Sequence, residues 1–226
     1  MDGSVLESSS EERDLGIRVN ISLKPSNQCL EAANRARRVL TQISKAFHYR
    51  TKGIFLKLYK TYVRPHLEFS VSAWCPWTVA DMTILENVQR RAVNMISGLN
   101  GNSYEEKLIE LNLESLADRR TYIDLVQTFK ILNSIDRVDY RTWFTIYGDL
   151  NSRVTRQSDY PLNLVRSEVS RTEVRNNFYS QRIINNWNSL PSYVKESITI
   201  AQFKTNYKLF KGANGGFQDA RMIVQG

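Results

Sequence analysis

The chain has 226 residues, of which 42% are hydrophobic and 24% charged, and its formal net charge is +8. This composition is typical of a folded chain with one or two domains and excludes wholesale disorder. No apolar run approaches the roughly 20 residues that span a bilayer, and the first residues lack a secretory signal pattern. We therefore expect an intracellular protein, nuclear or cytoplasmic, with no membrane partner.

Positive charge is concentrated in the first half of the chain. Residues 1–14 carry a net charge of −4, whereas residues 15–100 hold 13 Lys and Arg against four acidic residues. Such an asymmetry favours a polyanionic partner, although many basic surfaces bind nothing specific.

The acidic residues 1–13 are expected to form a disordered tail. Apolar residues then alternate with other side chains, which predicts a short, half-buried strand, and its apolar residues are Leu15, Ile17, Val19 and Ile21. Lys24-Pro25-Ser26 ends this strand, and Ser26 or Asn27 is expected to cap the helix that follows.

The clearest element is a helix over about residues 26–49. One apolar stripe runs along it, made of Cys29, Ala33, Ala36, Leu40, Ile43 and Phe47. A second stripe is offset by two residues, about 200° of helix rotation, and consists of Glu31, Arg35, Arg38, Gln42 and Lys45. This opposite face is either an ordinary solvated surface or a face that follows the phosphates of a nucleic acid.

Two further helical segments repeat this arrangement. In residues 52–64 the buried side is predicted to hold Phe55, Leu58 or Tyr59, and Tyr62, and Pro65 predicts a break or kink. In residues 81–97 the core seam is predicted to be Leu85, Val88, Ala92 and Met95. Thr78 is the expected N-cap of that helix, and Gly98 its stop.

Residues 14–100 are therefore predicted to be a basic helical bundle of three principal helices. Its buried residues should include Ala36, Leu40, Ile43, Leu58, Tyr62, Leu85, Val88 and Met95. The candidate nucleic-acid-binding residues are Arg35, Arg38, Lys45, Lys57, Lys60, Arg64, Arg90 and Arg91.

Residues 101–210 are predicted to form a second, mostly helical region. Helices are expected over residues 104–111 and 116–133, a short helix around 142–147, a small β-hairpin within 136–176, and a flexible tail over 211–226. Aromatic residues around Trp187 are either a base-stacking platform or, as is usual at helical spacing, core. The predicted fold class is mainly α.

Catalytic patterns are poor. His48, His66, Cys29 and Cys75 have no metal-ligand spacing, and no phosphate loop or nucleophile motif occurs. We expect no cofactor and no small-molecule substrate.

Several segments in order resemble the stretch that follows the polymerase palm in LINE-type (non-LTR, jockey- and CR1-like) retrotransposon reverse transcriptases. They are Leu58-Tyr59-Lys60, Val63-Arg64-Pro65-His66-Leu67-Glu68, Trp74-Cys75-Pro76-Trp77, Leu85-Glu86-Asn87-Val88-Gln89-Arg90-Arg91-Ala92 and Trp187-Asn188-Ser189-Leu190-Pro191. Asp14-Leu15-Gly16-Ile17 and Arg119-Arg120 also match, whereas Arg156-Gln157-Ser158 departs from the family's Arg-Gly-His-Ser. The resemblance extends from about Asp14 to about Phe210.

The resemblance implies that residues up to about 98 are a thumb, which grips a template–primer duplex of RNA or DNA without reading its sequence. It implies that residues 101–226 are the carboxy-terminal region, and that the first strand joins a sheet outside this chain. In a full-length RNA-directed DNA polymerase, palm aspartates hold Mg²⁺, but this chain contains no Tyr-x-Asp-Asp. We therefore expect a fragment that binds nucleic acid and is inactive alone. The alternatives are a helical protein-interaction module and a non-functional retrotransposon relic.

Overall fold

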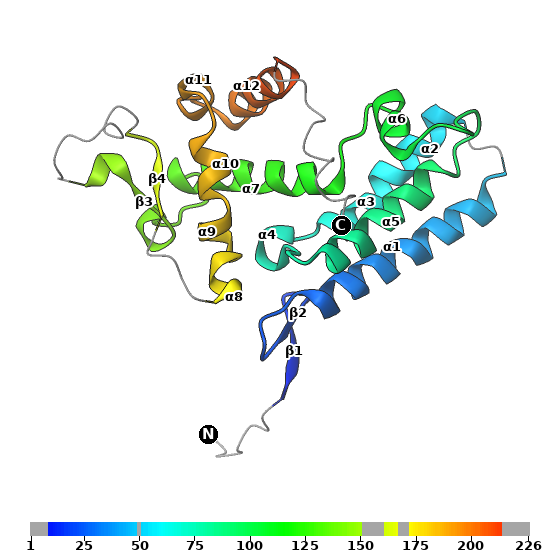
Figure 1. The fold of residues 1–226 in the computed structure, drawn as a ribbon, viewed down its shortest axis with the longest axis horizontal. Helices are drawn as coiled ribbons and strands as arrows, with labels where there is room; N and C mark the ends of the chain where they lie inside the picture. Colours follow the sequence, from blue (N-terminus) through cyan, green and yellow to red (C-terminus); the bar gives the residue numbers. More distant parts are fainter. Residues whose placement is uncertain (1–8, 49–50, 151–160, 167–171, 214–226) are drawn as a thin grey trace. The chain divides into compact units, whose positions relative to one another are not determined.

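The computed structural model describes residues 9–48, 51–150, 161–166 and 172–213. The fold is mainly α, with two small two-stranded antiparallel sheets (Figure 1), and this fold class was predicted. The chain divides into two compact units, Met1–Leu116 (unit 1) and Ala117–Gly226 (unit 2). The division lies later in the chain than the expected boundary near residue 100.

Unit 1 begins with a β-hairpin. Strand β1 (Glu11–Asp14) pairs with β2 (Ile17–Asn20), and the two-residue turn between them has positive φ angles, 46° at Leu15 and 86° at Gly16. Such a turn suits a tight hairpin. Two expectations were wrong here: residues 11–13 belong to a strand, not a disordered tail, and Leu15 and Ile21 are exposed rather than half-buried. The predicted strand was expected to join a sheet outside this chain, whereas β2 pairs with β1 of the same hairpin.

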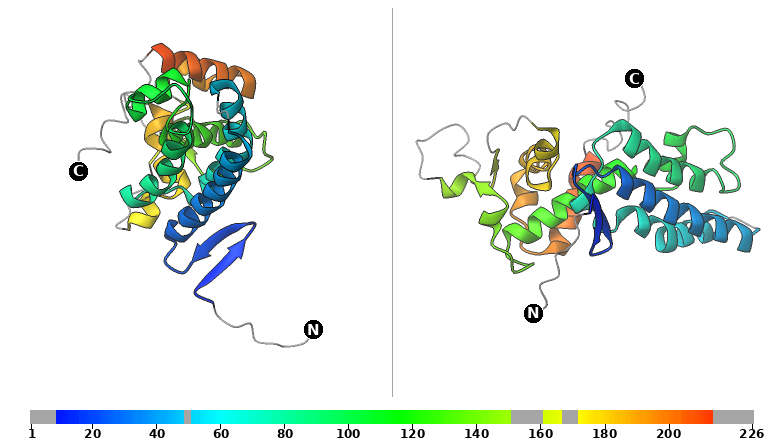
Figure 2. Two further views of the ribbon diagram at one scale, coloured as in Figure 1. Left: turned by 90° about the vertical axis from the view of Figure 1, so that its right-hand side faces the viewer. Right: turned by 90° about the horizontal axis from the view of Figure 1, so that it is seen from below.

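Helix α1 (Ser26–Ala46) follows the hairpin, which projects from its first turns (Figure 2). Its buried side confirms the predicted apolar stripe from Cys29 to Ile43. This side packs against helix α5 (Val79–Val93) and against the helical segment over residues 59–68. The predicted cap is absent, because the Ser26 hydroxyl instead donates a hydrogen bond to Asp81 Oδ2 at 2.9 Å.

The next segment is helical throughout but changes its geometry. Helix α2 (Lys52–Leu58) passes into a π-helical turn, η1 (Tyr59–Val63), and then into α3 (Arg64–Glu68). The Arg64 N–H bonds to the Tyr59 carbonyl, five residues back. Pro65 therefore falls in the first turn of α3, where a missing N–H costs little, and the chain stays helical through it.

This wide turn moves the buried face. The side chains that enter the core lie four residues apart and are Phe55, Tyr59, Val63, Leu67 and Val71. The predicted burial of Tyr62 was wrong, since this ring is 56% exposed, and Leu58 is only partly buried. The prediction placed Leu58 and Tyr62 in the core because it assumed a regular period of 3.6 residues and did not allow for the extra residue of the π turn.

Unit 1 closes with α4 (Val71–Trp74), α5 and α6 (Tyr104–Glu110). Thr78 caps α5 as predicted, since its hydroxyl accepts a hydrogen bond from the Asp81 N–H at 3.1 Å. Leu85 and Val88 are fully buried as predicted, whereas Met95 is only partly buried and α5 ends at Val93.

A polar network lies within this core. Gln89 is fully buried: its Oε1 accepts a hydrogen bond from Tyr59 at 2.5 Å, and its Nε2 donates to the Glu114 carbonyl and the Tyr104 hydroxyl at 3.0 Å. Tyr104 donates in turn to Glu86, whose carboxylate also accepts from the Leu116 N–H. Burial, followed by the Glu86 charge, raises the pKa of Tyr104, which stays neutral and donates.

The described residues of unit 2 form helices, short 3₁₀ turns and one small sheet. The elements are α7 (Leu116–Leu132, its first residue in unit 1), η2 (Tyr140–Thr142), β3 (Thr145–Ile146), η3 (Tyr147–Asp149), β4 (Leu164–Val165), α8 (Glu173–Asn176), α9 (Tyr179–Arg182), α10 (Ile184–Asn188), α11 (Ser192–Lys195) and α12 (Ile200–Ala213). Strands β3 and β4 pair antiparallel, which confirms the predicted small hairpin. Residues 211–213 belong to α12 rather than to a tail, and residues 156–158 and 214–226 lie outside the described part.

An aromatic core holds unit 2 together. Trp187 is 1% exposed, its ring stacks 6.1 Å from that of Phe203, and its Nε1 donates to the Leu162 carbonyl at 2.9 Å. Asn188 bonds both the N–H and the carbonyl of Leu164, so its side chain extends the pairing of β4. Of the two alternatives predicted for Trp187, a base-stacking platform and a core residue, the core position is confirmed.

Candidate nucleic-acid interface

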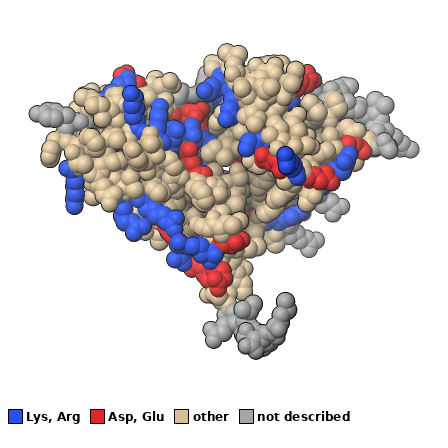
Figure 3. Space-filling model, turned by 180° about the vertical axis from the view of Figure 1, so that it is seen from behind, with Lys and Arg blue, Asp and Glu red and all other residues tan. Residues whose placement is uncertain are grey.

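The exposed side of α1 carries part of the predicted site. Arg38 and Lys45 are exposed on the side opposite the buried Leu40 and Ile43, as the stripe pattern predicted. A row of Lys and Arg side chains runs toward a group of acidic side chains on the face shown in Figure 3. Cations in such a row can follow the charges of a polyanion.

An open groove runs along α1 beside this face, and the hairpin lines its end near residues 27 and 28. Its volume is about 910 Å³. The lining includes Arg18, Arg37 and Arg38, together with uncharged polar side chains and one exposed leucine, namely Asn27, Asn34, Thr41, Gln42 and Leu30. Glu11 and Glu31 complete it. The groove follows α1 from residue 27 to residue 42, which is roughly 22 Å at 1.5 Å per residue.

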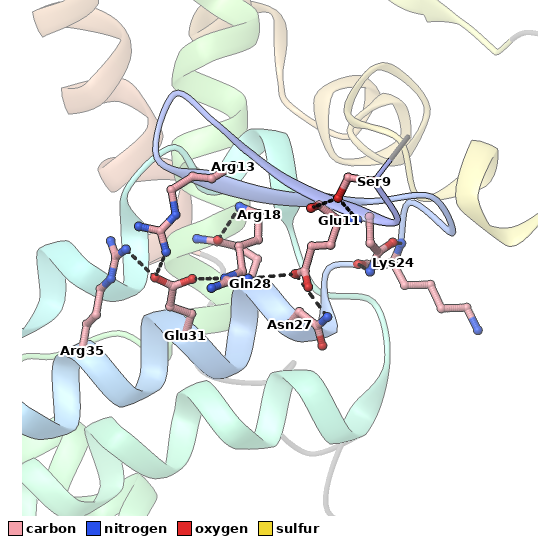
Figure 4. Close-up of polar contacts among 10 residues, drawn as sticks. Ser9, Glu11, Arg13, Arg18, Lys24, Asn27, Gln28, Glu31 and Arg35 are labelled. Atoms are coloured by element: carbon pink, nitrogen blue, oxygen red, sulfur yellow. Dashed lines mark hydrogen bonds and ion pairs between the residues drawn. The ribbon is translucent and has the colours of Figure 1, made fainter. Parts of the chain in front are cut away.

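Glu31 joins the hairpin to α1 (Figure 4). Three guanidinium groups converge on its carboxylate: Arg18 Nε at 2.5 Å, and the groups of Arg13 and Arg35. Arg18 also lies 3.5 Å from a carboxylate oxygen of Glu11. We call this set, residues 11, 13, 18, 31 and 35, the Glu31 cluster.

The protonation of Glu31 follows from these contacts. Burial raises the pKa of its carboxyl, but the hydrogen bonds from Arg18, Arg13 and Arg35 outweigh that effect and leave the pKa below its usual value. The pKa is lower in the folded chain than in the unfolded one. The stability that the cluster contributes is therefore present above the ordinary glutamate pKa and is lost as the pH falls through the folded value.

The remaining predicted residues lie outside the groove lining, and several have structural contacts. Arg64 pairs with Glu68 at 3.5 Å, and the Arg90 guanidinium lies 4.3 Å from the centre of the Tyr104 ring. Lys57 and Arg91 are exposed, and Lys60 is partly buried. Of the eight predicted residues, Arg38 alone lines the groove.

Sequence reasoning missed Arg13, Arg18 and Arg37. Arg37 is not a member of the predicted stripe, because it precedes the stripe residue Arg38 by one position, yet it lines the groove. Arg13 and Arg18 become cross-strand partners because of the two-residue turn at Leu15 and Gly16. A tight turn read from Leu15-Gly16 would have paired these two arginines, but Leu is a rare first residue in such a turn.

The described residues hold no group of three or more His, Cys, Asp or Glu side chains that could bind a metal ion. Over the same residues, none of the helices has the length and apolarity needed to cross a membrane.

Comparisons with family models, with curated proteins and with solved structures find no match to this chain.

Proposed function

We propose that unit 1 binds the sugar–phosphate backbone of an RNA or DNA duplex without reading its sequence. The observation that carries this proposal is the two-sided character of α1. One side is buried through Leu40 and Ile43, and the other presents Arg38 and Lys45 to solvent beside a groove rich in arginine. Arg and Lys that face solvent in a row are the usual donors to phosphate oxygens.

We further propose that the chain corresponds to the thumb and carboxy-terminal region of a LINE-type reverse transcriptase. The segments that carry the resemblance support it through the roles they have in this fold. Gln89 is the centre of the unit 1 network, and Trp187 and Asn188 organise the core of unit 2. Framework residues of this kind are what a shared fold would retain.

A protein-interaction module is the second candidate. Ile54, Tyr62 and Phe69 are each more than half exposed along the segment from α2 to the end of α3. Exposed apolar side chains are typical of a protein-binding surface where they form a continuous patch.

Substitution of Arg35, Arg38 and Lys45 by Gln tests the nucleic-acid proposal. About five phosphate contacts give a slope of log affinity against log salt near −4.5, and the triple variant should flatten it by about 2–3 units on every duplex. The fold should persist, because Leu40 and Ile43 face the other way, Gln is a good helix former, and Glu31 keeps its ion pairs with Arg13 and Arg18 when Arg35 is changed. Fluorescence anisotropy with labelled duplexes over a salt series gives both numbers.

The matched control removes three exposed cations from unit 2, at Arg166, Lys204 and Lys208. We expect this control to change the affinity far less than the α1 variant does. Wild-type protein that binds no duplex at low salt, or an α1 variant that binds as tightly as the control, would refute the proposal. Binding lost instead on changing Ile54, Tyr62 and Phe69 to polar residues, measured with a protein partner, would favour the interaction module.

A further inference from the structure

We infer that unit 2 contains an anion site at Arg120, in the second turn of α7, and that its ligand is inorganic phosphate. This inference is independent of the proposed function, because the site lies in unit 2 and requires no nucleic acid. It starts from a buried guanidinium group that has an unpaired donor.

Arg120 is buried without a complete set of hydrogen bonds. The residue is 5% exposed, and its Nη1 is the one buried side-chain nitrogen or oxygen that has no hydrogen-bond partner among the described residues. A guanidinium group stays charged and carries five N–H donors. Its removal from water is costly unless acceptors and an opposite charge replace the water. The described residues therefore leave part of this cost uncompensated.

The other buried polar groups on the same side of α7 have partners. Asp124 and Thr128 follow Arg120 at intervals of four residues, so the three side chains lie in one row. Asp124 Oδ2 accepts a hydrogen bond from Arg182 Nε at 3.0 Å and lies 2.9 Å from Arg182 Nη2. The Thr128 hydroxyl bonds the Tyr179 hydroxyl at 2.8 Å. Helix α9, which contains Tyr179 and Arg182, thus supplies partners for Asp124 and Thr128, whereas Arg120 Nη1 has none among the described residues.

The charge of this group of side chains is also unbalanced. Arg120 and Arg182 are both positive, whereas Asp124 alone is negative, and Asp124 is 3% exposed. Opposite charges attract more strongly in the protein interior than in water, because the interior has a lower dielectric constant. One added negative charge beside Arg120 would neutralise the group.

A compact oxyanion fits this site. Only a small part of Arg120 contacts solvent, so a ligand must be small to reach it. A guanidinium group holds two oxygens of a phosphate or a carboxylate in a fork. Phosphate is favoured over acetate and sulfate because it keeps a proton near neutral pH. That proton can be donated to an acceptor such as Asp124, one helical turn away, whereas a fully deprotonated anion would only be repelled by this carboxylate.

Isothermal titration calorimetry of the full chain with inorganic phosphate tests the site. Sodium chloride holds the ionic strength constant, so that screening does not change during the titration. The wild-type chain should bind phosphate saturably, and Arg120→Gln should weaken this binding at least about tenfold. The matched control is Arg166→Gln, which removes an exposed arginine of unit 2 and should change the Kd less than about twofold.

Thermal unfolding separates ligand binding from a purely structural role of Arg120. Phosphate should raise the unfolding temperature of the wild type in a saturable way and leave that of Arg120→Gln unchanged. Without phosphate, Arg120→Met should be at least as stable as the wild type, because it removes a buried charge that lacks a partner. If Arg120→Met is less stable than the wild type both with and without phosphate, the role of Arg120 is structural and the inference fails.

The folding of the variants and the choice of ligand have their own controls. If Arg120→Gln does not fold, Arg120→Lys replaces it, since this variant keeps the charge, loses the fork and should weaken phosphate binding about tenfold. A wild-type chain that shows no saturable binding, or a variant at Arg120 that binds as tightly as Arg166→Gln, would overturn the inference. Acetate or sulfate that binds as tightly as phosphate at equal ionic strength would overturn the assignment to phosphate.

Discussion

Two groups of charged side chains, one in each unit of this protein, are placed in opposite ways. In unit 1, Arg38 and Lys45 face solvent, and the guanidinium groups around Glu31 outnumber the carboxylates. In unit 2, Arg182 bonds Asp124 at 2.9 Å with both side chains largely buried, and Lys195 is 6% exposed. The Lys195 ammonium donates to Asn163 Oδ1 at 2.7 Å and to the Asn188 carbonyl at 3.0 Å.

The number of basic residues therefore does not identify a binding surface. A cation that is buried with its hydrogen-bond acceptors has few donors that a ligand can reach. A cation on an exposed helix face loses little by exchanging water for a phosphate. Whether a cation is buried or exposed depends on its position relative to the apolar stripe of its helix.

The largest expected loss of stability is in unit 2 and leaves unit 1 folded. Trp187→Ala should destabilise unit 2 by about 3–5 kcal/mol, because a fully buried ring that stacks on Phe203 is removed and the Leu162 carbonyl loses its donor. Urea unfolding of the full chain measures this loss. Duplex binding should persist while unit 1 stays folded, and binding lost at a urea concentration where unit 1 is intact would contradict the comparison.

A smaller effect is expected in the core of unit 1. Gln89→Leu should cost about 2–3 kcal/mol, since the buried Tyr59 hydroxyl would lose its acceptor and the Glu114 carbonyl and Tyr104 hydroxyl would lose a donor. The matched control is Arg90→Gln, which removes only the exposed guanidinium over Tyr104 and should cost less than about 1 kcal/mol. Equal losses in the two variants, measured by denaturant unfolding, would mean that the network contributes no more than a surface contact.

The smallest effect tests the buried lysine. Burial lowers the pKa of Lys195 from its ordinary 10.5 to about 8. Between these values the unfolded chain binds more protons, so stability should rise with pH through this window. The gain relative to Lys195→Met should be about 1–2 kcal/mol, because the two hydrogen bonds of the ammonium oppose the shift.

The control for this pH series is Lys204→Met, which changes an exposed lysine of α12. Its stability should follow that of the wild type over the same pH range. Parallel curves for the wild type and Lys195→Met, from thermal unfolding at each pH, would show that Lys195 does not titrate in this window.

The long helices, and the side of each that is buried, follow from local apolar spacing alone. In α1 and α5 the apolar spacing is regular, so local periodicity and packing agree, and Leu40 and Val88 are fully buried as expected. The Thr78 cap followed in the same way from its place before the first turn. These features depend on residues that are close together in the chain.

Features that join residues far apart in the chain depend on tertiary packing. The π turn over residues 59–63 placed Tyr59 and Val63 in the core and left Tyr62 exposed, because packing against α1 selects the rows that fit. The groove depends on a hairpin that brings Arg13 and Arg18 to Glu31, up to 18 residues away. The periodicity of apolar residues does not predict which carboxylate three arginines will share. That depends on the fold, which brings the guanidinium groups and the carboxylate within hydrogen-bonding distance.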